Sequence, residues 1–373
     1  MRGRVVILGA GVGGTIVANR LARRLRTTDA DILVVDGASH HVYQPGLLYL
    51  PFNNHNPQTL ARPLRRLLNP RVQLLHGTVR SIDPAAHVVQ VDGQRVPYDW
   101  LVLATGCRLT PERVPGFSSV HHFYDLDGAI HLRQTLRAVE RGTIVVGPTR
   151  KVYKCPPAPL EFVLLLDDHL RGAGLRDRIE LRYFSPVADV FHGKKVARVV
   201  NPLLDARGIR VTTEFNVKEI TDGTIRSHEG KEIRFDLAVL VPPHRVAAAI
   251  ETAGLAPEGW VSVDPHTLRV IGQERIFALG DVTALPIPKT GAVAHFQAPT
   301  VAEGIMADLR GVGPSRSYNG RVLCLIETGA GRATMMGFDY DRPAQPAPPS
   351  RLYHWAKTIV NRTYWWTIPS GYI

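Results

Sequence analysis

The feature that most constrains the fold is a glycine-rich segment near the N-terminus, between the sequences of a strand and a helix. Residues 4–8 read Arg-Val-Val-Ile-Leu, and this β-branched run is typical of a buried strand. Three glycines follow in G-x-G-x-x-G spacing: Gly9, Gly11 and Gly14. After an amphipathic helix, a second strand at 32–35 ends at Asp36, 22 residues beyond Gly14. This succession predicts a βαβ unit that binds a dinucleotide.

Each residue of such a unit has a mechanical role. Gly9 makes the tight turn, Gly11 lets the backbone approach a pyrophosphate, and Gly14 lets the helix pack on the strand. The helix N-terminus offers free N–H groups to the phosphates, and we expect Asp36 to accept a hydrogen bond from a ribose hydroxyl. The unit alone does not distinguish FAD from NAD.

Two later segments each combine a buried strand with a small-residue turn. The first runs from Trp100 and ends in Ala104-Thr105-Gly106, and the second covers 275–282 and contains Gly280-Asp281. Both resemble the second and third flavin motifs of the two-dinucleotide-domain flavoproteins, which include glutathione reductase and type II NADH dehydrogenases. The resemblance implies FAD as the cofactor, with these five turn residues beside it and with the Gly-Asp pair at its ribityl and phosphate region.

The place where that family binds NAD(P)H has a different sequence here. After a predicted strand at 143–147, residues 148–159 lack the glycine spacing and carry prolines where N–H donors are needed. The next strand, 179–184, is followed by Ser185-Pro186 and no acid for a ribose. We therefore expect a second Rossmann-like domain that has lost NAD(P)H, and an electron donor of another kind.

A cysteine and a glutamate lie in and after this altered loop. Lys151 and Lys154 flank Cys155, and we expect their charges to depress the pKa of its thiol. Glu161 begins the next helix, where a carboxylate can exchange protons with the sulfur. Two alternatives stay open on composition alone: a buried apolar cysteine and a glutamate that only complements the helix dipole.

From Gly9 to the C-terminus the chain resembles the sulfide:quinone oxidoreductases and the related flavocytochrome c sulfide dehydrogenase flavoprotein. Residues 154–161, Lys-Cys-Pro-Pro-Ala-Pro-Leu-Glu, are similar to the family's Lys-Cys-x-x-Ala-Pro segment. Residues 319–324 end in Cys324, where the family has its second redox cysteine. Lys289, in Pro-Lys-Thr-Gly, matches a family lysine near the flavin. His192 resembles a family histidine near the quinone, with an ordinary surface histidine as the alternative.

The resemblance implies a redox pair of Cys155 and Cys324, 169 positions apart, on one flavin face. Hydrosulfide would attack one sulfur of their disulfide or polysulfide bridge, and the released thiolate would pass two electrons to FAD, which reduces a quinone. Glu161, Lys289 and His192 complete the implied catalytic set. The loop 114–127 lacks the third cysteine that many family members have. The branch of the family that this chain resembles most is therefore undetermined. Cys107 is interpreted as structural.

The last segment predicts contact with a membrane surface. Residues 351–368 read as an amphipathic helix whose apolar face carries Leu352, Trp355, Ala356 and Ile359. Three of the chain's five tryptophans lie there, at 355, 365 and 366, and the cations Arg351, Lys357 and Arg362 suit a headgroup region. The Pro-rich run 343–349 is interpreted as a linker that lets the helix swing out. A helix packed on the protein, or a dimer interface, is the alternative.

Charge and composition restrict the classes of partner that this chain is expected to bind. A formal net charge of +12 favours an anionic partner. The basic residues do not interleave with aromatics in one stretch and no zinc-ligand cluster is evident, so we expect a membrane surface and no nucleic acid or metal. No run of about 18 apolar residues is present, and the first apolar run reads as a strand and not as a signal sequence. The expected location is peripheral on the cell membrane, and a homo-oligomer stays open.

The predicted architecture is an α/β fold with two Rossmann-like dinucleotide-binding domains of the glutathione reductase type and a C-terminal membrane-associating segment. We assign residues 1–110 and 258–312 to an FAD-binding domain, 111–257 to the second domain, and 313–373 to the C-terminal region. The predicted function is that of an FAD-dependent sulfide:quinone oxidoreductase. The alternatives are a flavocytochrome c-type sulfide dehydrogenase subunit, a type II NADH:quinone reductase, and a flavin-binding redox sensor without turnover.

Overall fold

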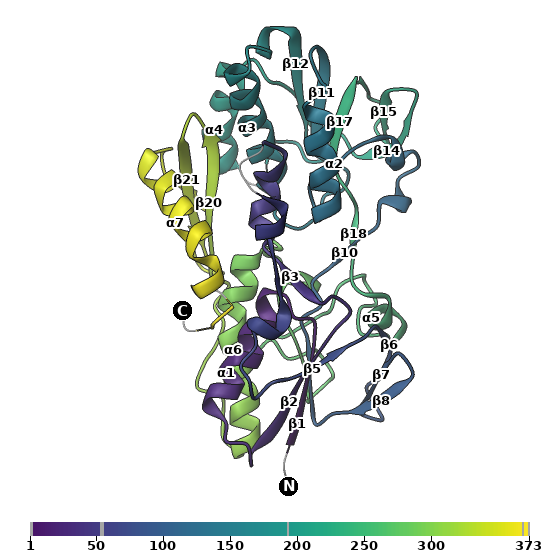
Figure 1. Cartoon of the computed structure of the whole chain (residues 1–373), viewed down its shortest axis with the longest axis vertical. Coiled ribbons are helices and arrows are strands. Elements are labelled where there is room, and N and C mark those ends of the chain that lie inside the picture. Colours follow the sequence, from purple (N-terminus) through teal and green to yellow (C-terminus); the bar gives the residue numbers. More distant parts are fainter. Residues whose placement is uncertain (1–2, 53–55, 192–193, 368, 372–373) are drawn as a thin grey trace.

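The computed structural model describes residues 3–52, 56–191, 194–367 and 369–371. Two parallel sheets lie at opposite ends of an elongated molecule, and a C-terminal hairpin and helix run along one side (Figure 1). None of the described helices has both the length and the apolar character that crossing a bilayer requires.

The first sheet has five parallel strands in the order β19-β9-β1-β2-β5. These are β1 (Gly3–Leu8), β2 (Ala30–Asp36), β5 (Gln73–His76), β9 (Trp100–Leu103) and β19 (Ile276–Ala278). Nearly all positions of β1 and β9 are buried because helices and loops cover both faces. The edge strand β19 comes from late in the chain, so this sheet is built from two separate stretches of sequence.

Two helices and a small antiparallel sheet complete this end of the molecule. The helices α1 (Val12–Arg24) and α6 (Gly291–Arg310) pack on each other (Figure 1). The small sheet consists of β6 (Val79–Asp83), β7 (Val88–Val91) and β8 (Gln94–Pro97), with α5 (Ala248–Thr252) packed on β6. A two-stranded ladder of β3 (His40–Val42) and β4 (Ala61–Pro63) lies after β2 along the chain.

The second sheet has four parallel strands in the order β13-β12-β11-β17. They are β11 (Gly142–Pro148), β12 (Ile179–Phe184), β13 (Arg210–Thr212) and β17 (Leu237–Val241). The accompanying elements are α2 (Leu126–Leu136), α3 (Ala158–Gly172), α4 (Lys194–Ala206) and the strands β14 (Val217–Thr221), β15 (Thr224–Ser227) and β16 (Glu232–Arg234). The short ladder of β10 (Arg108–Leu109) and β18 (His244–Arg245) joins the two ends of the molecule.

The C-terminal part consists of a hairpin of β20 (Val322–Gly329) and β21 (Arg332–Phe338), the strand β22 (Gln345–Pro346), and the helix α7 (Arg351–Thr367). The interpretation of residues 343–349 as a free linker was wrong. The strand β22 pairs with β21, and the Ala347 N–H donates to the Met335 carbonyl at 2.9 Å. The α/β architecture with parallel sheets is confirmed, whereas the domain boundaries stay a prediction.

Candidate active site

The glycine loop between β1 and α1 has the geometry that its spacing predicts. Gly9 has φ +97°, a conformation that side chains disfavour. A Cβ on Gly14 would lie 1.9 Å from the Gly9 carbonyl oxygen, so only glycine allows α1 to approach β1 this closely. A Cβ on Gly11 would meet no other atom of the described chain within 4 Å. The loop is therefore closed on its strand side and open where a phosphate would lie.

The other two flavin-motif turns end at the same edge of the sheet. The Ala104 N–H donates to the Leu8 carbonyl at 2.8 Å, and the Leu279 N–H donates to the Leu103 carbonyl at 3.1 Å, so the turns after β9 and β19 lie beside the glycine loop. The Thr105 hydroxyl is buried and has no hydrogen-bond partner among the described residues. Such an orphaned polar group fits a ligand that supplies the missing partner.

Gly106 and Gly280 have φ values of +62° and +76°, and the Gly280 N–H donates to the buried Gln297 side chain at 2.6 Å. The N-cap of α1 is Gly11, which has no side chain, and the first turn of α1 contains no acidic residue. The positive end of this helix is therefore available to an anion. The residues present fit a dinucleotide whose pyrophosphate lies at α1.

Asp36 supports the glycine loop itself. Its two carboxylate oxygens accept hydrogen bonds from the Ala10 N–H at 2.6 Å and from the Ala38 N–H at 2.7 Å. The sequence predicted a contact with a ribose hydroxyl and gave no indication of this bond to the loop. A carboxylate has lone pairs beyond these two bonds, so the ribose contact stays a prediction.

The loop after β11 forms no comparable cradle. The Thr149 hydroxyl donates to the Val241 carbonyl at 2.8 Å, and the Arg150 guanidinium donates to the Val217 carbonyl at 2.6 Å. Side chains thus fill this edge of the second sheet, where a dinucleotide-binding loop would offer backbone N–H groups.

Cys155 lies at the contact between the two ends of the molecule. Its N–H donates to the Lys289 carbonyl at 2.6 Å, and Lys154 and Lys289 form an isolated parallel bridge. Cys155 has φ +52°, an uncommon conformation for a residue with a side chain, held by this bond and by the start of α3. The structure therefore brings the predicted residues Cys155 and Lys289 together from segments 134 positions apart in the sequence.

Cys155 and Cys324 pack against the same apolar core, and both are partly buried. The helix α3 packs against β20, which carries Cys324, and the two thiols carry no disulfide. A negative charge on Cys324 contributes to the raised pKa of Cys155, and the charges of Glu161 and Lys357 act on both thiols. The two cysteines with Glu161 and Lys357 are called the thiol pocket below, and the redox pairing of the two sulfurs stays a prediction.

The expectation that Lys151 and Lys154 depress the pKa of the Cys155 thiol was wrong. Burial, followed by the charges of Glu161 and Cys324, raises that pKa well above its ordinary value, and only Lys357 opposes the shift appreciably. Lys154 lies 5.8 Å from the centre of the Tyr124 ring and acts on Asp281 and Cys107 instead. Burial likewise raises the pKa of Cys324 to about 12, so both thiols are protonated at neutral pH.

Glu161 anchors a buried chain of polar groups beside the thiols. It forms an ion pair with Lys357 of α7, and its carboxylate also accepts a hydrogen bond from the Glu327 N–H at 2.7 Å. The Glu327 carboxylate accepts from the Tyr49 hydroxyl at 2.9 Å and lies 3.0 Å from Nδ1 of His354. The chain leads from the thiol pocket to His354, which is partly exposed on α7.

The assignment of Lys357 to a lipid headgroup region was therefore wrong, because this side chain points inward and pairs with Glu161. Sequence reasoning also missed Tyr49 and Glu327. The helical periodicity did place Lys357 away from the apolar face, and this was the available signal that it points toward the protein.

Lys289 is buried in a cage of oxygen atoms and an aromatic ring. Its ammonium donates to the carbonyls of Asp281 and Thr283 at 2.9 and 2.7 Å and lies 3.6 Å from the centre of the Trp260 ring. Burial lowers the pKa of Lys289 to about 8. The Cys107 thiol lies 3.9 Å from the Asp281 carboxylate, and burial raises its pKa.

One predicted residue, His192, and two residues that sequence reasoning missed, His244 and Tyr124, remain to be placed. His192 lies outside the described residues. His244 was missed: burial, followed by the charge of Lys154, lowers its pKa to about 3, and its ring meets Tyr124 edge-on at 5.5 Å. The Tyr124 hydroxyl lies 3.5 Å from the Cys155 carbonyl, so Tyr124 lies between His244 and the backbone of Cys155.

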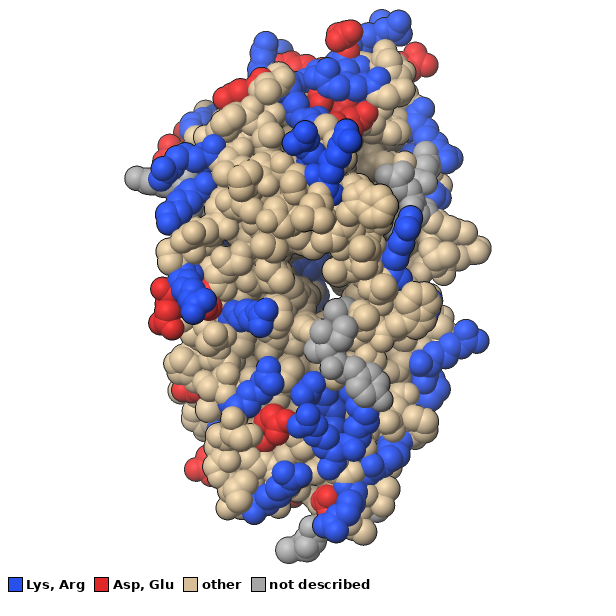
Figure 2. Space-filling view, turned by 90° about the vertical axis from the view of Figure 1, so that its left-hand side faces the viewer, with Lys and Arg blue, Asp and Glu red and all other residues tan. Residues whose placement is uncertain are grey.

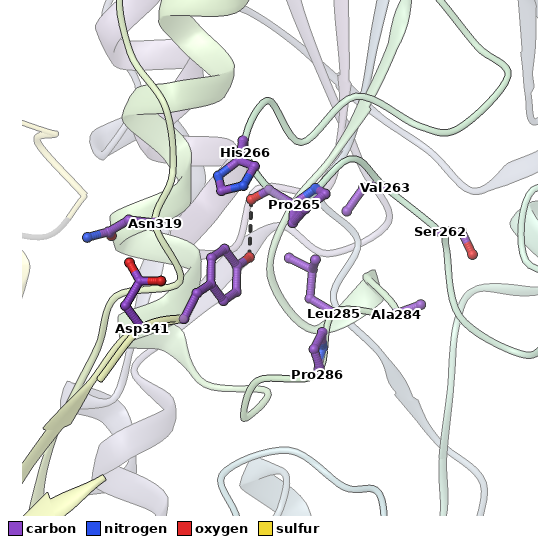
Figure 3. Close-up of a pocket in the computed structure, with 10 residues that line it drawn as sticks. Ser262, Val263, Pro265, His266, Ala284, Leu285, Pro286, Asn319 and Asp341 are labelled. Atoms are coloured by element: carbon purple, nitrogen blue, oxygen red, sulfur yellow. Dashed lines mark hydrogen bonds between the residues drawn. The ribbon is translucent and has the colours of Figure 1, made fainter. Parts of the chain in front are cut away.

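A separate pocket of 530 Å³ is lined by the segments on both sides of β19, by the residue Asn319 before β20 and by the turn after β21 (Figure 3). It is lined by Ser262, Val263, Pro265, His266, Ala284, Leu285, Pro286, Asn319, Tyr340 and Asp341. The Tyr340 hydroxyl donates to the Pro265 carbonyl across it at 3.1 Å. None of the predicted site residues lines this pocket, so the site described above is distinct from it.

Comparison with known proteins first concerns the N-terminal part of the chain. Residues 3–148 match the family described as pyridine nucleotide-disulphide oxidoreductase, a stretch that contains the glycine loop and the turn after β9 and ends with β11. This match covers the first part of the chain, and the two parallel sheets agree with it.

Over nearly its whole length the chain is similar to several sulfide:quinone oxidoreductases. It is 28% identical to the mitochondrial sulfide:quinone oxidoreductase of Dictyostelium discoideum over 90% of this chain and 78% of that protein. It is 23% identical to the sulfide-quinone reductase of Aquifex aeolicus over 100% of this chain and 93% of that protein. The crystal structure of the Aquifex aeolicus sulfide:quinone oxidoreductase superposes with a TM-score of 0.90 at 23% identity, covering 99% of this chain and 92% of that one. The resemblance that the sequence motifs indicated is confirmed.

Proposed function

We propose that this chain is an FAD-dependent sulfide:quinone oxidoreductase that oxidises sulfide through Cys155 and Cys324 and reduces a membrane quinone. The observation that carries this proposal is that Cys155, whose N–H donates to the Lys289 carbonyl, has its pKa raised by the charge of Cys324, which lies 169 positions away in the sequence. The related proteins named for the same activity support it. Among relatives, a type II NADH:quinone oxidoreductase of Mycobacterium tuberculosis matches over 84% of the chain. The side chains that fill the loop after β11 argue against that alternative.

The chemistry of the thiol pocket follows from the groups that line it. In the oxidised pair, hydrosulfide attacks one sulfur, an S–S bond to the incoming sulfur forms, and the bond between Cys155 and Cys324 breaks to release a thiolate. The attacked cysteine then carries the added sulfur as a persulfide, and the thiolate and the deprotonated persulfide can close a trisulfide by giving up two electrons and one proton. Bound FAD would supply the acceptor of these two electrons. Because burial raises the pKa of both thiols, the transient thiolate depends on the nearby positive charge of Lys357. Glu161, whose pKa burial raises, can hold or release the accompanying proton.

The decisive experiment compares two electron donors under anaerobic conditions. We expect sulfide to bleach the flavin absorbance of the purified yellow protein, NADH to leave it unchanged, and a short-chain quinone to restore it. Bleaching by NADH and not by sulfide would establish the type II NADH:quinone reductase alternative. Bleaching by sulfide with electron transfer to cytochrome c, and none to quinone, would favour the flavocytochrome c-type subunit. Bleaching without steady-state quinone reduction would indicate a sensor.

The proposal includes docking at a membrane surface through α7. Five large apolar side chains of this helix are exposed, with exposed fractions from 49% to 73%: Leu352, Trp355, Ile359, Val360 and Trp366. Trp365, which was expected to contribute, is instead partly buried against the protein beneath Arg62. Figure 2 shows the side of the molecule that carries α7, with basic side chains spread over it and an opening near its centre. An apolar helix face among basic groups suits an anionic bilayer surface.

Charged substitutions on this face should weaken membrane binding strongly. We expect Trp355→Glu combined with Ile359→Glu to reduce binding to vesicles of anionic phospholipid at least about thirtyfold. Each large side chain contributes roughly 1.5 kcal/mol or more when it leaves water, and glutamate adds repulsion from the lipid. Vesicle co-sedimentation measures the effect. Ile271→Glu, at an apolar side chain that is 64% exposed outside α7, is the matched control and should bind as the wild type does.

Lys289 gives the flavin-reduction step a predictable pH dependence. Its lowered pKa means that it carries its charge below about pH 8 and loses it above. If this charge attracts hydrosulfide and holds reduced flavin, the bleaching rate should fall as pH rises through about 8. In Lys289→Gln the rate should be roughly tenfold to hundredfold lower at pH 7 and should show no such fall. Stopped-flow traces at several pH values test this. If the bleaching rate falls with the same pH dependence in both proteins, Lys289 is excluded as the origin of that pH dependence.

A further inference from the structure

Ala10, at the centre of the glycine loop, forms hydrogen bonds through both its backbone N–H and its carbonyl. The Ala10 N–H donates to the Asp36 carboxylate at 2.6 Å. The Ala10 carbonyl lies 3.0 Å from Nδ1 of His41 and also accepts from the Thr15 hydroxyl at 2.9 Å. Since the side of the loop that faces a ligand is open at Gly11, these contacts behind the loop determine its position.

The bond to Ala10 fixes the protonation of His41. A carbonyl oxygen only accepts, so Nδ1 must carry the proton. In a neutral ring Nε2 is then an acceptor, and it accepts a hydrogen bond from the Tyr364 hydroxyl at 2.6 Å. Burial lowers the pKa of His41, which is 4% exposed, so the ring stays neutral at physiological pH. The donor order Tyr364 to His41 to Ala10 is therefore the only one in which both bonds form with a neutral ring.

Tyr364 belongs to α7, the helix whose outer face is proposed to meet the membrane. Its ring is buried and packs on Tyr43 with centroids 4.5 Å apart. The polar anchors of α7 lie at three positions: His354 on Glu327, Lys357 on Glu161, and Tyr364 on His41. Spacings of three and seven residues place these anchors on one side of a helix. The inner face of α7 thus contacts the thiol pocket through Lys357 and, two turns later, the residues behind the glycine loop through Tyr364.

We propose that His41 and Tyr364 are positioning residues of the glycine loop, and that docking of α7 on the protein and binding of FAD at the loop therefore stabilise each other. The inference rests on the flavin site of the proposed function. Coupling between two binding events is reciprocal: what α7 contributes to FAD retention, FAD must contribute to α7 docking. A quinone reductase gains from this arrangement, because its flavin is held most firmly when the helix that faces the acceptor is in place.

The test uses the holoenzyme and an isosteric variant. Tyr364→Phe keeps the packing of the ring and removes only the hydrogen bond to His41. We expect FAD release, followed as the rise of free-flavin fluorescence after dilution, to be about fivefold faster than in the wild type, as the loss of one buried hydrogen bond predicts. Tyr318→Phe is the matched control: the residue is buried like Tyr364, and its hydroxyl donates to the Arg321 carbonyl at 2.9 Å, away from the loop. It should release FAD at the wild-type rate.

The reciprocal effect distinguishes positioning from general destabilisation. Arg362 is an exposed residue of α7 that trypsin can cleave. We expect added FAD to slow this cleavage in the wild-type protein, and the protection to be about fivefold smaller in Tyr364→Phe. His41→Gln, which removes the ring from the chain of bonds, should behave in the same way and serves if the first variant fails to fold.

Three outcomes are distinguishable. Faster release with weaker protection in the variants supports the inference. Wild-type release and protection in both variants, with FAD bound, overturns it and leaves the proposed function intact. Failure of the wild-type protein to bind FAD overturns the proposed function, and the inference with it.

Discussion

In the Cys155→Ser variant we expect sulfide to leave the flavin fully oxidised, with the rate of bleaching reduced at least about a thousandfold. A serine hydroxyl can neither form a disulfide with Cys324 nor leave as a thiolate, so no electron pair is released toward FAD. Losses of this size are usual when a residue that forms a covalent bond in the mechanism is removed. Anaerobic stopped-flow absorbance of the flavin band measures the effect, and the variant should still be isolated as a yellow protein.

Cys324→Ser should lose activity to a similar extent, because the two sulfurs act as one redox unit and their effects are not additive. Cys107→Ser is the matched control within the same flavin region. Its thiol contacts Asp281 and is not among the groups that act on Cys155, so we expect bleaching within about threefold of the wild-type rate. Wild-type bleaching in both Cys155→Ser and Cys324→Ser would contradict the proposed mechanism. Loss of activity in Cys107→Ser alone would indicate that Cys107 is the redox-active thiol.

The parts of the site that sequence predicts well are those whose requirements are local. Gly9, Gly11 and Gly14 meet their steric demands within one turn of chain, and parallel strands bring the turns at 104–106 and 280–281 to the same edge of a sheet. Their geometry follows from spacing and strand order. The pairing of Cys155 with Cys324 does not follow in this way: it was expected only through the family resemblance, and it stays a prediction.

The wrong expectation about the pKa of Cys155 has one physical cause: neighbours in the sequence were taken for neighbours in space. Lys154 adjoins Cys155 in the chain but points to Tyr124 and Asp281, whereas Lys357, 202 positions away, is the cation that acts on the thiol. Burial then outweighs the charges and raises the pKa of Cys155. No local pattern carries information on how deeply a loop is covered by a helix from the other end of the chain.

Breaking the ion pair of Glu161 and Lys357 from one side should have the largest effect on stability. In Lys357→Met the carboxylate stays buried without its counter-ion, and we expect the free energy of unfolding to fall by about 3–5 kcal/mol near pH 8. Glu161→Gln leaves the ammonium unpaired and should cost a similar amount. The double variant Glu161→Gln/Lys357→Met removes both charges and should recover most of the loss, since well-packed neutral groups often replace a buried pair without penalty. Urea unfolding of the holoenzyme, followed by flavin release, measures all four proteins.

The pH dependence of the single variant identifies the carboxylate as the cause. Burial already raises the pKa of Glu161, and without Lys357 it must rise further above the ordinary value of 4.5. A raised pKa in the folded state means that the folded protein holds a proton that the unfolded chain releases, so stability is retained below about pH 4.5 and is lost as pH rises toward the folded pKa. The deficit of Lys357→Met should therefore grow from pH 5 to pH 8, whereas the exposed control Lys231→Met should stay within about 0.5 kcal/mol of the wild type throughout. If the losses of the two single variants simply add in the double variant, the two side chains are not coupled, and the proton-holding role of Glu161 loses its electrostatic basis.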